Sequence, residues 1–263
     1  MLTRDELSAI LACTVCRAPL ALPDAPDARC AACATVYRRL NHAWDLTPPR
    51  ARWSSGAWES WEHLQGNGTV SYREDPDHNL GVGDRADYLE FSQFARLHGL
   101  VLDVGCGPQA WPTHFSQHAQ GTQFVGVDPL VGDEEARYTQ IRALAEYLPF
   151  TDDVFDHVVF ATSLDHFVDP LAALRVARRV VAVDGAVDVW VGHKSADAPA
   201  RSDSPEWYRN LTRPEGADDV FHMERLDGPA SEELFARAGL KVDRSHMQQV
   251  DEFRSNRFYS LRA

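Results

Sequence analysis

The stretch LVLDVGCGPQA, residues 100–110, joins an apolar run to a turn rich in glycine. The run predicts a strand that is buried on both faces of a parallel sheet. Asp103 lies near the end of this strand, and Gly105 and Gly107 follow at once. Ligands of open α/β sheets bind beyond the carboxyl ends of the strands, where glycine lets the backbone turn tightly and approach them. The stretch therefore predicts a ligand site as well as a strand.

The segments on either side alternate between strand and helix patterns. Helices are expected at 83–99, at 169–182 and within 231–243. Further strands are expected after the last helix and at 122–128, 137–143, 155–162, 185–192 and 257–263. Such alternation predicts an α/β fold with a doubly wound, mostly parallel sheet.

The expected helix ends rest on capping residues. Asp84 is expected to cap the first helix and Gly99 to end it, while Ser231 and Gly239 are expected to do the same for the last one. Only residues 129–136 separate the second strand from the third, which is too few for a crossover helix. An irregular link is expected there instead.

A second acidic residue, Asp128, follows the next predicted strand. Together with the glycine turn, it fits either NAD or a nucleoside cofactor with an amino-acid end. Asp128 can accept hydrogen bonds from ribose hydroxyls, and GCGPQA (105–110) fits the degenerate glycine fingerprint of NAD enzymes. A pyrophosphate at a helix N-terminus would, however, lie close to the Asp103 carboxylate. The same carboxylate suits a cofactor with a cationic amino-acid end.

Four segments in order resemble the class I S-adenosylmethionine-dependent methyltransferases, in particular their small-molecule (UbiE-like) branch, from about residue 84 to 263. These segments are VLDVGCG (101–107), VGVD (125–128), AEYLPFTDDVFDHVVF (145–160), and SLDHFVDPLAALRVARRV (163–180) with VDGAVDVWV (183–191). The resemblance implies a Rossmann-like, seven-stranded methyltransferase sheet. It also implies an enzyme that transfers a methyl group to a small molecule by in-line displacement.

The resemblance assigns roles to the residues that match its motifs. Asp103 would lie near the methionine amino group, the two glycines beneath the cofactor, and Asp128 at the ribose. The remaining cofactor-binding residues would be Ala145 and Glu146 beside the adenine, and Ser163 and Leu164 near the methionine arm. Two positions depart from the family pattern, because Leu144 replaces a frequent Asp and Gln109 replaces a frequent third Gly.

Candidate acceptor-side residues follow the fourth predicted strand. Asp165 and His166 are the candidate catalytic pair, and we hypothesise that His166 acts as a general base or orients the acceptor. A base is needed only if the nucleophile must lose a proton. The alternative for His166 is a helix-capping or packing role. For His193 and His222, packing is the favoured interpretation.

The chain divides into three expected parts. Residues 1–48 form a zinc-ribbon-like domain, 49–83 an aromatic linker and helical segment, and 84–263 the methyltransferase domain. Trp58, Trp61 and Leu64 share one helix face, which predicts packing on the body of the protein. The long polar segment 193–226 is expected to form an active-site cover.

Four cysteines near the start form two C-x-x-C pairs, Cys13 with Cys16 and Cys30 with Cys33. Two such pairs separated by thirteen residues are close to the pattern of a zinc site. Four thiolates close a tetrahedral shell, so the expected zinc is structural. The fifth cysteine, Cys106, is expected to be a small packed residue.

Composition narrows the classes of partner. The net charge of −13 repels phosphate backbones at long range, so a nucleic-acid substrate is disfavoured but possible. The sequence has no secretory signal and no long apolar run, which predicts a cytoplasmic protein without a membrane partner. The oligomeric state stays open.

Other functions remain open beside methyl transfer to a small molecule. A zinc ribbon ahead of this domain also resembles the guanine-N1 methyltransferases of large-subunit ribosomal RNA, which implies a ribbon-guided rRNA or tRNA base methyltransferase. A third hypothesis is a non-catalytic methyltransferase-like module that binds a partner. An NAD oxidoreductase is disfavoured by Asp103 and by LPFTDDVFD (148–156).

Overall fold

The computed structural model describes residues 1–53, 55–79, 85–195, 197–198 and 204–263. In this part of the chain, ten strands form one sheet in the order β1-β2-β3-β6-β5-β4-β7-β8-β10-β9. The strands are β1 (Asp27–Arg29), β2 (Val36–Arg39), β3 (Trp44–Asp45), β4 (Leu100–Val104), β5 (Gln123–Val127), β6 (Thr139–Arg142), β7 (Phe155–Ala161), β8 (Val181–Lys194), β9 (Lys241–Gln249) and β10 (Arg254–Arg262).

Seven neighbouring strands of this sheet, in the order β6-β5-β4-β7-β8-β10-β9, form the doubly wound sheet that the sequence predicts. Strands β6, β5, β4, β7 and β8 run parallel to one another, and β10 pairs antiparallel with both β8 and β9. Residues 128–138 link β5 to β6 without a helix, which confirms the expected irregular link. The prediction of a mostly parallel, Rossmann-like sheet is confirmed.

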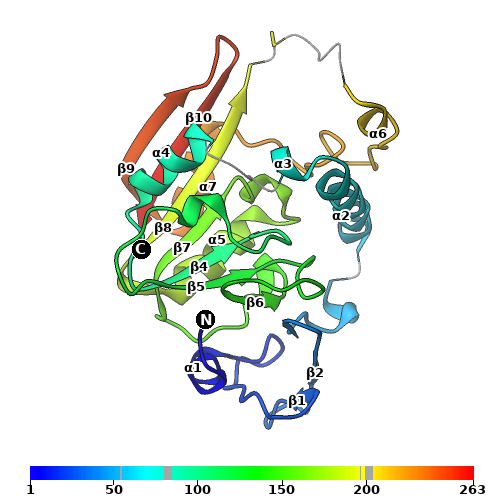
Figure 1. Cartoon of the computed structure of the whole chain (residues 1–263), viewed down its shortest axis with the longest axis vertical. Helices are drawn as coiled ribbons and strands as arrows, with labels where there is room; N and C mark the ends of the chain where they lie inside the picture. Colours follow the sequence, from blue (N-terminus) through cyan, green and yellow to red (C-terminus); the bar gives the residue numbers. More distant parts are fainter. Residues whose placement is uncertain (54, 80–84, 196, 199–203) are drawn as a thin grey trace.

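Helices cover both faces of this sheet (Figure 1). On one face, Phe91 packs in a cluster with Val101; on the other, Leu174 and Phe235 pack in a cluster with Leu102. Successive residues of a strand point to opposite faces, so the two clusters are separate layers of the core. The helices are α1 (Arg4–Ile10), α2 (Gly56–Glu74), α3 (Pro76–Asn79), α4 (Ala86–Ala95), α5 (Pro170–Val180), α6 (Glu206–Arg209) and α7 (Gly228–Ala238), with short 3₁₀ turns at Arg50–Arg52, Thr113–Phe115, Ala145–Tyr147 and Leu164–His166.

Helix α7 begins three residues before the predicted cap. Asp227 is the N-cap and accepts a hydrogen bond from the amide of Ala230, while the Ser231 hydroxyl is buried and donates to the Asp227 carbonyl. The expectation for Ser231 is therefore wrong, because Asp227 precedes a proline in the first turn, where proline starts helices well. The prediction that Gly239 ends the helix is confirmed by its left-handed backbone, with φ of +76°.

Helix α4 ends before the predicted glycine. Arg96, not Gly99, adopts the left-handed cap conformation, with φ of +56°. Gly99 instead turns the chain into β4, where a Cβ atom would lie 2.0 Å from the Asp156 carboxylate. That carboxylate accepts a hydrogen bond from the amide of Leu100, so the absence of a side chain at Gly99 lets Asp156 reach the start of β4. The predicted cap at Asp84 lies outside the described residues.

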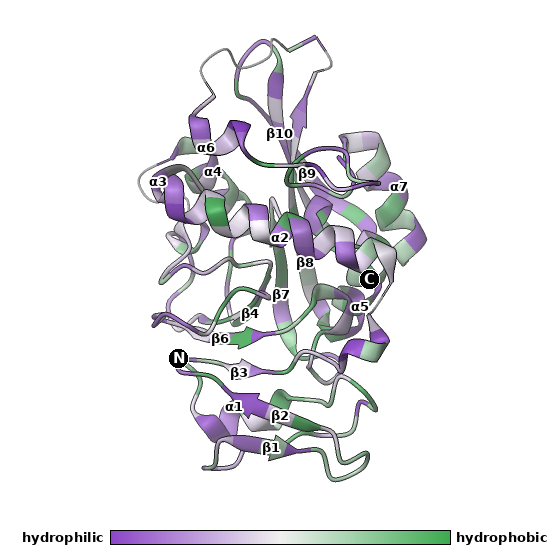
Figure 2. Ribbon diagram, turned by 90° about the vertical axis from the view of Figure 1, so that its right-hand side faces the viewer, coloured by the Kyte–Doolittle hydropathy of each residue, from purple (hydrophilic) through white to green (hydrophobic). Residues whose placement is uncertain are grey.

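The cysteine-rich segment extends the sheet. Strand β3 pairs in parallel with β6, so that Trp44 lies opposite Ile141 and Asp45 opposite Arg142. Strands β1 and β2 continue outward from β3 at the blue end of the chain (Figure 1), and Figure 2 shows β1, β2, β3 and β6 stacked in succession. The Ala12 amide also donates to the Pro149 carbonyl. One sheet therefore runs through both units, and β6 is not an exposed edge.

Helix α2 packs its tryptophans on the body of the protein, as the sequence predicts. Trp58 and Trp61 are buried, with ring centroids 5.4 Å apart, and Trp53 meets both of them edge-on. Leu144 completes this cluster from the segment after β6. None of the described helices is long and apolar enough to cross a membrane.

Candidate functional site

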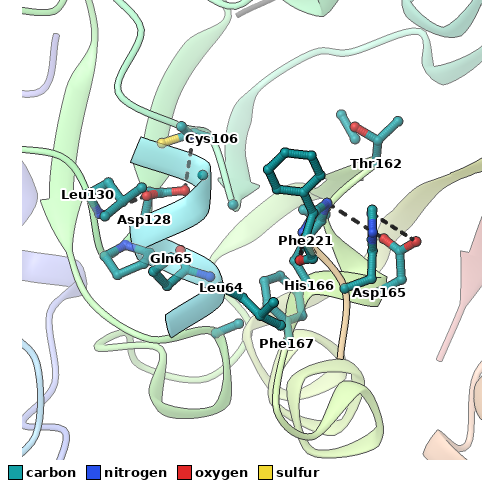
Figure 3. A pocket seen from close by; sticks show the side chains of 18 of the residues that line it. Leu64, Gln65, Cys106, Asp128, Leu130, Thr162, Asp165, His166, Phe167 and Phe221 are labelled. Atoms are coloured by element: carbon teal, nitrogen blue, oxygen red, sulfur yellow. Dashed lines mark hydrogen bonds and ion pairs between the residues drawn. The ribbon is translucent and has the colours of Figure 1, made fainter. Parts of the chain in front are cut away.

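A cavity of about 390 Å³ lies beyond the carboxyl ends of β4, β5 and β7. Figure 3 shows Asp128, Cys106 and Gln65 on one side, Asp165, His166 and Phe221 on the other, and Leu64 of α2 between them. The lining also includes Gly105, Gly107, Leu144, Ala145, Glu146, Ser163, Tyr72, Tyr88, His114, His222 and Arg225. A volume of this size is typical of small-molecule sites.

The glycine turn after β4 forms the floor of the cavity. Gly105 and Gly107 have φ of +80° and +67°, a backbone conformation that residues other than glycine rarely adopt. A Cβ atom on Gly105 would lie 2.5 Å from Cβ of Ser163. No helix starts directly after this turn, since the first helical residue is Thr113. The turn therefore lacks the helix N-terminus that receives the pyrophosphate in dinucleotide enzymes.

Asp128 lies at the end of β5 beside the glycine turn. Its carboxylate accepts hydrogen bonds from the amides of Gly107 at 3.0 Å and Leu130 at 2.8 Å, which fix its orientation. Burial raises the pKa of Asp128 to about 6, although both amides lower it. The group is still mostly ionised at pH 7 and can accept further hydrogen bonds from a ligand.

Asp103 is fully buried and does not itself line the cavity. It contacts His114, whose Nε2 lies 3.0 Å from the Asp103 Oδ2 atom, and His114 lines the cavity in its place. Asp103 Oδ1 and His114 Nδ1 are buried without a hydrogen-bond partner among the described residues. Of this pair, His114 is therefore the member that a bound ligand can contact.

The turn after β6 provides another wall. Ala145, Glu146 and Leu144 all line the cavity. The Glu146 carboxylate accepts hydrogen bonds from the amides of Val168 and Asp169, and burial raises its pKa to about 7. Leu144 and Trp61 make this wall apolar, which suits a flat aromatic ring more than a charged group.

Ser163 and Leu164 follow β7 but differ in position. Ser163 lines the cavity, and its hydroxyl donates to the Val104 carbonyl at 2.6 Å. Leu164 is buried in the hydrophobic core and does not contact the cavity. The structure therefore brings seven of the eight predicted cofactor residues to the cavity or, for Asp103, to a residue that lines it.

Asp165 and His166 lie together at the far wall, joined by a residue from the predicted cover. His222 Nε2 lies 3.7 Å from one Asp165 oxygen, and His166 Nε2 lies 4.0 Å from the other. The two imidazole rings are 4.2 Å apart. His222 is only 8% exposed and Asp165 only 9%. The sequence separates these histidines by 55 residues, so spacing alone could not join them.

Hydrogen bonds orient both imidazoles. His222 Nδ1 lies 2.7 Å from Asp219 Oδ1, and His166 Nδ1 lies 3.0 Å from the Phe221 carbonyl. Burial, reinforced by the neighbouring His222, lowers the pKa of His166 to about 4. Burial opposes ionisation of Asp219, but the hydrogen bonds and charges of His222, Phe221 and Arg225 together outweigh it and lower the pKa of Asp219. Arg225 Nε donates to the same carboxylate at 2.8 Å.

The predicted cover segment contributes some of its residues to the cavity. Phe221 and His222 line it, while His193 lies on β8 and does not. Asn67 of α2 donates hydrogen bonds to the carbonyls of Thr212 and Val220, which attaches the segment to the helix above the cavity. Sequence reasoning missed Arg225 and His114, which line the cavity, and Asp219, which orients His222, since nothing in their local pattern marks them.

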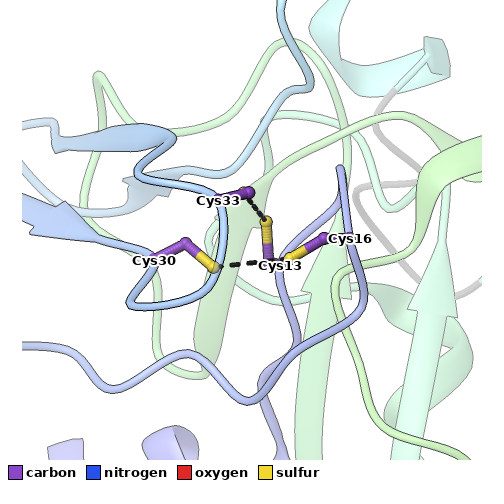
Figure 4. A group of neighbouring side chains, drawn as sticks. All are labelled: Cys13, Cys16, Cys30 and Cys33. Atoms are coloured by element: carbon purple, nitrogen blue, oxygen red, sulfur yellow. Dashed lines mark hydrogen bonds between the residues drawn. The ribbon is translucent and has the colours of Figure 1, made fainter.

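The four predicted metal-ligating cysteines converge near the start of the chain (Figure 4). Their sulfur atoms all lie within 4.8 Å of one another, with Cys13 3.6 Å from Cys33 and Cys16 3.5 Å from Cys30. These separations exceed a disulfide bond and are close to the value of about 3.8 Å for thiolates around one tetrahedral zinc ion. The donor set fits zinc.

Hydrogen bonds around the sulfurs support the same interpretation. The Tyr37 hydroxyl lies 3.0 Å from Cys13 Sγ and accepts from the Thr14 amide, while the Val15 amide donates to Cys13 Sγ. Such outer contacts orient the ligands of a metal site. Cys106 is 1% exposed and belongs to the core, so burial raises its thiol pKa well above the usual range.

The sheet order and the glycine turn with its acidic neighbours define the class: a class I S-adenosylmethionine-dependent methyltransferase. A family model described as a methyltransferase domain matches residues 83–245, and the chain belongs to this family. The protein is therefore an enzyme of the methyltransferase group, for which S-adenosylmethionine binding is expected.

Two solved structures illustrate the shared fold. One is a possible histamine N-methyltransferase from Thermotoga maritima, with 16% identity, 76% of this chain and 99% of that chain covered, and a TM-score of 0.50. The other is an S-adenosylmethionine-dependent methyltransferase from Leishmania major, with 13% identity, 79% and 83% covered, and a TM-score of 0.50. No curated protein sequence matches the chain.

Proposed function

We propose that this protein transfers a methyl group from S-adenosylmethionine to a small-molecule acceptor. One observation carries the proposal: a single cavity holds the glycine turn and Asp128 at one end and Asp165, His166 and His222 at the other. The first end offers the groups that a nucleoside with an amino-acid tail needs. The second offers polar groups for an acceptor.

On the cofactor side, each end of the ligand has a matching set of residues. Asp128 would hold the ribose hydroxyls, and the apolar wall of Trp61, Leu144 and Ala145 would face the adenine. His114, held by the buried Asp103, would meet the charged methionine end, and Gly105 leaves space beneath it. The bound cofactor supplies the electrophilic methyl group.

On the acceptor side, catalysis rests mainly on position. The leaving group of methyl transfer is neutral, so holding the acceptor in line supplies much of the rate. Asp165 and His166 would orient the acceptor. A histidine whose pKa is about 4 is a weak base at neutral pH, so we favour the orienting role over general-base catalysis for His166.

A small acceptor fits the surroundings better than a polynucleotide. Asn67 attaches the cover segment to α2, which leaves Phe221 and His222 over the cavity. The net charge of −13 also disfavours a phosphate backbone. Binding of structured RNA that weakens steeply with salt would support the RNA methyltransferase alternative instead.

We further propose that Cys13, Cys16, Cys30 and Cys33 hold a structural zinc ion. Four thiolates leave no open position for water, so the ion supports folding and takes no part in the chemistry. Thiolates of this kind persist in a reducing compartment, which supports a cytoplasmic location. The boundaries of the ribbon at residue 48 and of the cover at 193–226 are part of the same proposal.

Calorimetry with S-adenosylhomocysteine and with NAD tests the cofactor assignment. We expect one S-adenosylhomocysteine per chain, no NAD binding, and at least a tenfold loss of affinity in Asp128→Asn. Asp152→Asn is the matched control, because that carboxylate lies at the surface and pairs with Arg179. Binding of NAD in preference to S-adenosylhomocysteine would overturn the proposal. Cofactor binding without turnover of any small acceptor would support a non-catalytic module.

A further inference from the structure

The wall of the cavity on the proposed acceptor side, called the acceptor wall below, carries three side chains of types that commonly bind divalent transition metals. Asp165 and His166 come from the turn after β7, and His222 comes from the cover segment. One ligand atom of each lies within 4.8 Å of those of the other two. Ligands around a single ion lie at most about 4.4 Å apart, so a small rotation of the side chains closes the set.

Hydrogen bonds fix which nitrogen of each histidine is free. A carbonyl and a carboxylate can only accept, so His166 Nδ1–H donates to the Phe221 carbonyl and His222 Nδ1–H donates to Asp219. Each Nε2 atom therefore keeps its lone pair, and both lone pairs are on the atoms nearest Asp165. Metal-binding histidines almost always donate their other N–H to a carboxylate or carbonyl in this way.

The net charge of the cluster is negative, which favours a bound cation. Asp165 and Asp219 contribute two negative charges, against one positive charge from Arg225, which lies 3.8 Å from Asp165 and 2.8 Å from Asp219. The Arg225 side chain is 53% exposed, so it can turn toward solvent when a cation binds. Its position also means that Arg225 competes with a metal ion for Asp165.

We propose that Asp165, His166 and His222 bind a divalent first-row metal ion such as Mn²⁺, which would hold an oxygen atom of the acceptor. The proposal rests on the proposed function, since it assigns the acceptor wall of that site. Two imidazoles and one carboxylate leave positions of the ion open, as in catalytic sites. The acceptor would then be a molecule that presents a hydroxyl or carboxylate group to the metal.

The test is a titration of the full chain, its ribbon loaded with zinc, with Mn²⁺. Binding is measured as the loss of the electron paramagnetic resonance signal of free Mn²⁺. Mn²⁺ prefers oxygen and nitrogen over thiolates, so the cysteine site does not interfere. We expect one Mn²⁺ per chain and an affinity at least tenfold lower in His222→Gln and in Asp165→Asn. Arg225→Gln should bind Mn²⁺ several-fold more tightly, because a competing cation is removed.

Two controls make the outcome decisive. His193→Gln makes the same change on β8, away from the cavity, and should bind Mn²⁺ like the original protein. S-adenosylhomocysteine affinity is measured on every variant as a check that the fold and cofactor end are intact. Failure of the original protein to bind Mn²⁺, or equal binding by His222→Gln, overturns the metal site while S-adenosylhomocysteine binding still supports the methyltransferase. Loss of S-adenosylhomocysteine binding by the original protein overturns the proposed function itself.

Discussion

The Ser163 hydroxyl donates a 2.6 Å hydrogen bond to the Val104 carbonyl, and its Cβ occupies the space that a side chain at position 105 would need. This contact joins the turn after β7 to the end of β4. It explains why glycine is required at 105 for two reasons, a positive φ and a lack of space. The two reasons can be measured separately, because another glycine has only one of them.

Gly105→Ala should destabilise the protein more than Gly121→Ala. Both glycines have similar φ, +80° and +85°, but nothing lies within 4 Å of a Cβ at Gly121. The left-handed backbone alone costs about 1–2 kcal/mol, and forcing a methyl group against Ser163 adds about 1–3 kcal/mol. Urea unfolding gives both free energies, and calorimetry should show that only Gly105→Ala weakens S-adenosylhomocysteine binding. Equal free energies of unfolding for the two variants would contradict this explanation.

The affinity for S-adenosylhomocysteine should rise as the pH increases from about 5 to 7. The pKa of Asp128 is raised to about 6 in the free protein, and ribose hydroxyls donate to its ionised form. Calorimetry across this range should show the rise in the original protein and its loss in Asp128→Asn. Glu146→Gln is the control, since removing the other group with a raised pKa should leave a transition near 6.

The same raised pKa has the opposite effect on stability without ligand. The folded protein binds the Asp128 proton more tightly than the unfolded chain, whose aspartates titrate near pH ~3.9. The stability contributed by Asp128 is therefore complete below about pH 4 and is lost as the pH rises through about 6. In urea unfolding, the free energy of unfolding of the original protein should fall relative to that of Asp128→Asn as the pH rises from about 4 through about 6. The difference should level off at higher pH.

Metal analysis should find one zinc ion per chain. Cys16→Ser should lose the ion, because three thiolates no longer close the shell, whereas Cys106→Ser should keep it. Loss of zinc should also weaken S-adenosylhomocysteine binding, since β3 supports β6 and residue 144 on the cavity wall follows β6 directly. A zinc content far below one in the original protein would refute the metal assignment. Unchanged cofactor affinity in Cys16→Ser would refute the link to β6.

Asn67→Ala should loosen the cover segment. Its amide nitrogen donates to the carbonyls of Thr212 and Val220 at 2.9 and 2.7 Å, and the substitution removes both hydrogen bonds. We expect S-adenosylhomocysteine to dissociate several-fold faster, as measured by stopped-flow fluorescence, because opening of a cover commonly limits release. Thr69→Ala is the matched control, since that hydroxyl donates only within α2 to Gln65.

The sequence predicts the parts of the site that depend on local order. Gly105, Gly107 and Asp128 follow buried strands directly, and the carboxyl ends of neighbouring parallel strands meet at one edge of the sheet. The convergence of the cysteine pairs is equally predictable, because two short turns are enough to bring four thiolates together. Their spacing alone indicates which four sulfur atoms meet.

Other parts depend on contacts between distant segments. His222 reaches His166 only because the segment after β8 folds back over α2, and no local pattern encodes that return. Asp227 and Ser231 are both good caps, and the choice between them depends on where α7 meets the sheet. Strand β3 has only two residues, too few for a periodic signal, yet its pairing with β6 joins the two units.

The pairing of β3 with β6 determines how this chain can be divided. Excision of the first 48 residues would remove β3 from one side of β6, and an uncovered strand edge invites association with other chains. A shortened protein that starts near α2 should therefore aggregate or form edge-to-edge dimers. Expression of the methyltransferase body by itself therefore requires a covering strand or another element that protects the freed edge of β6.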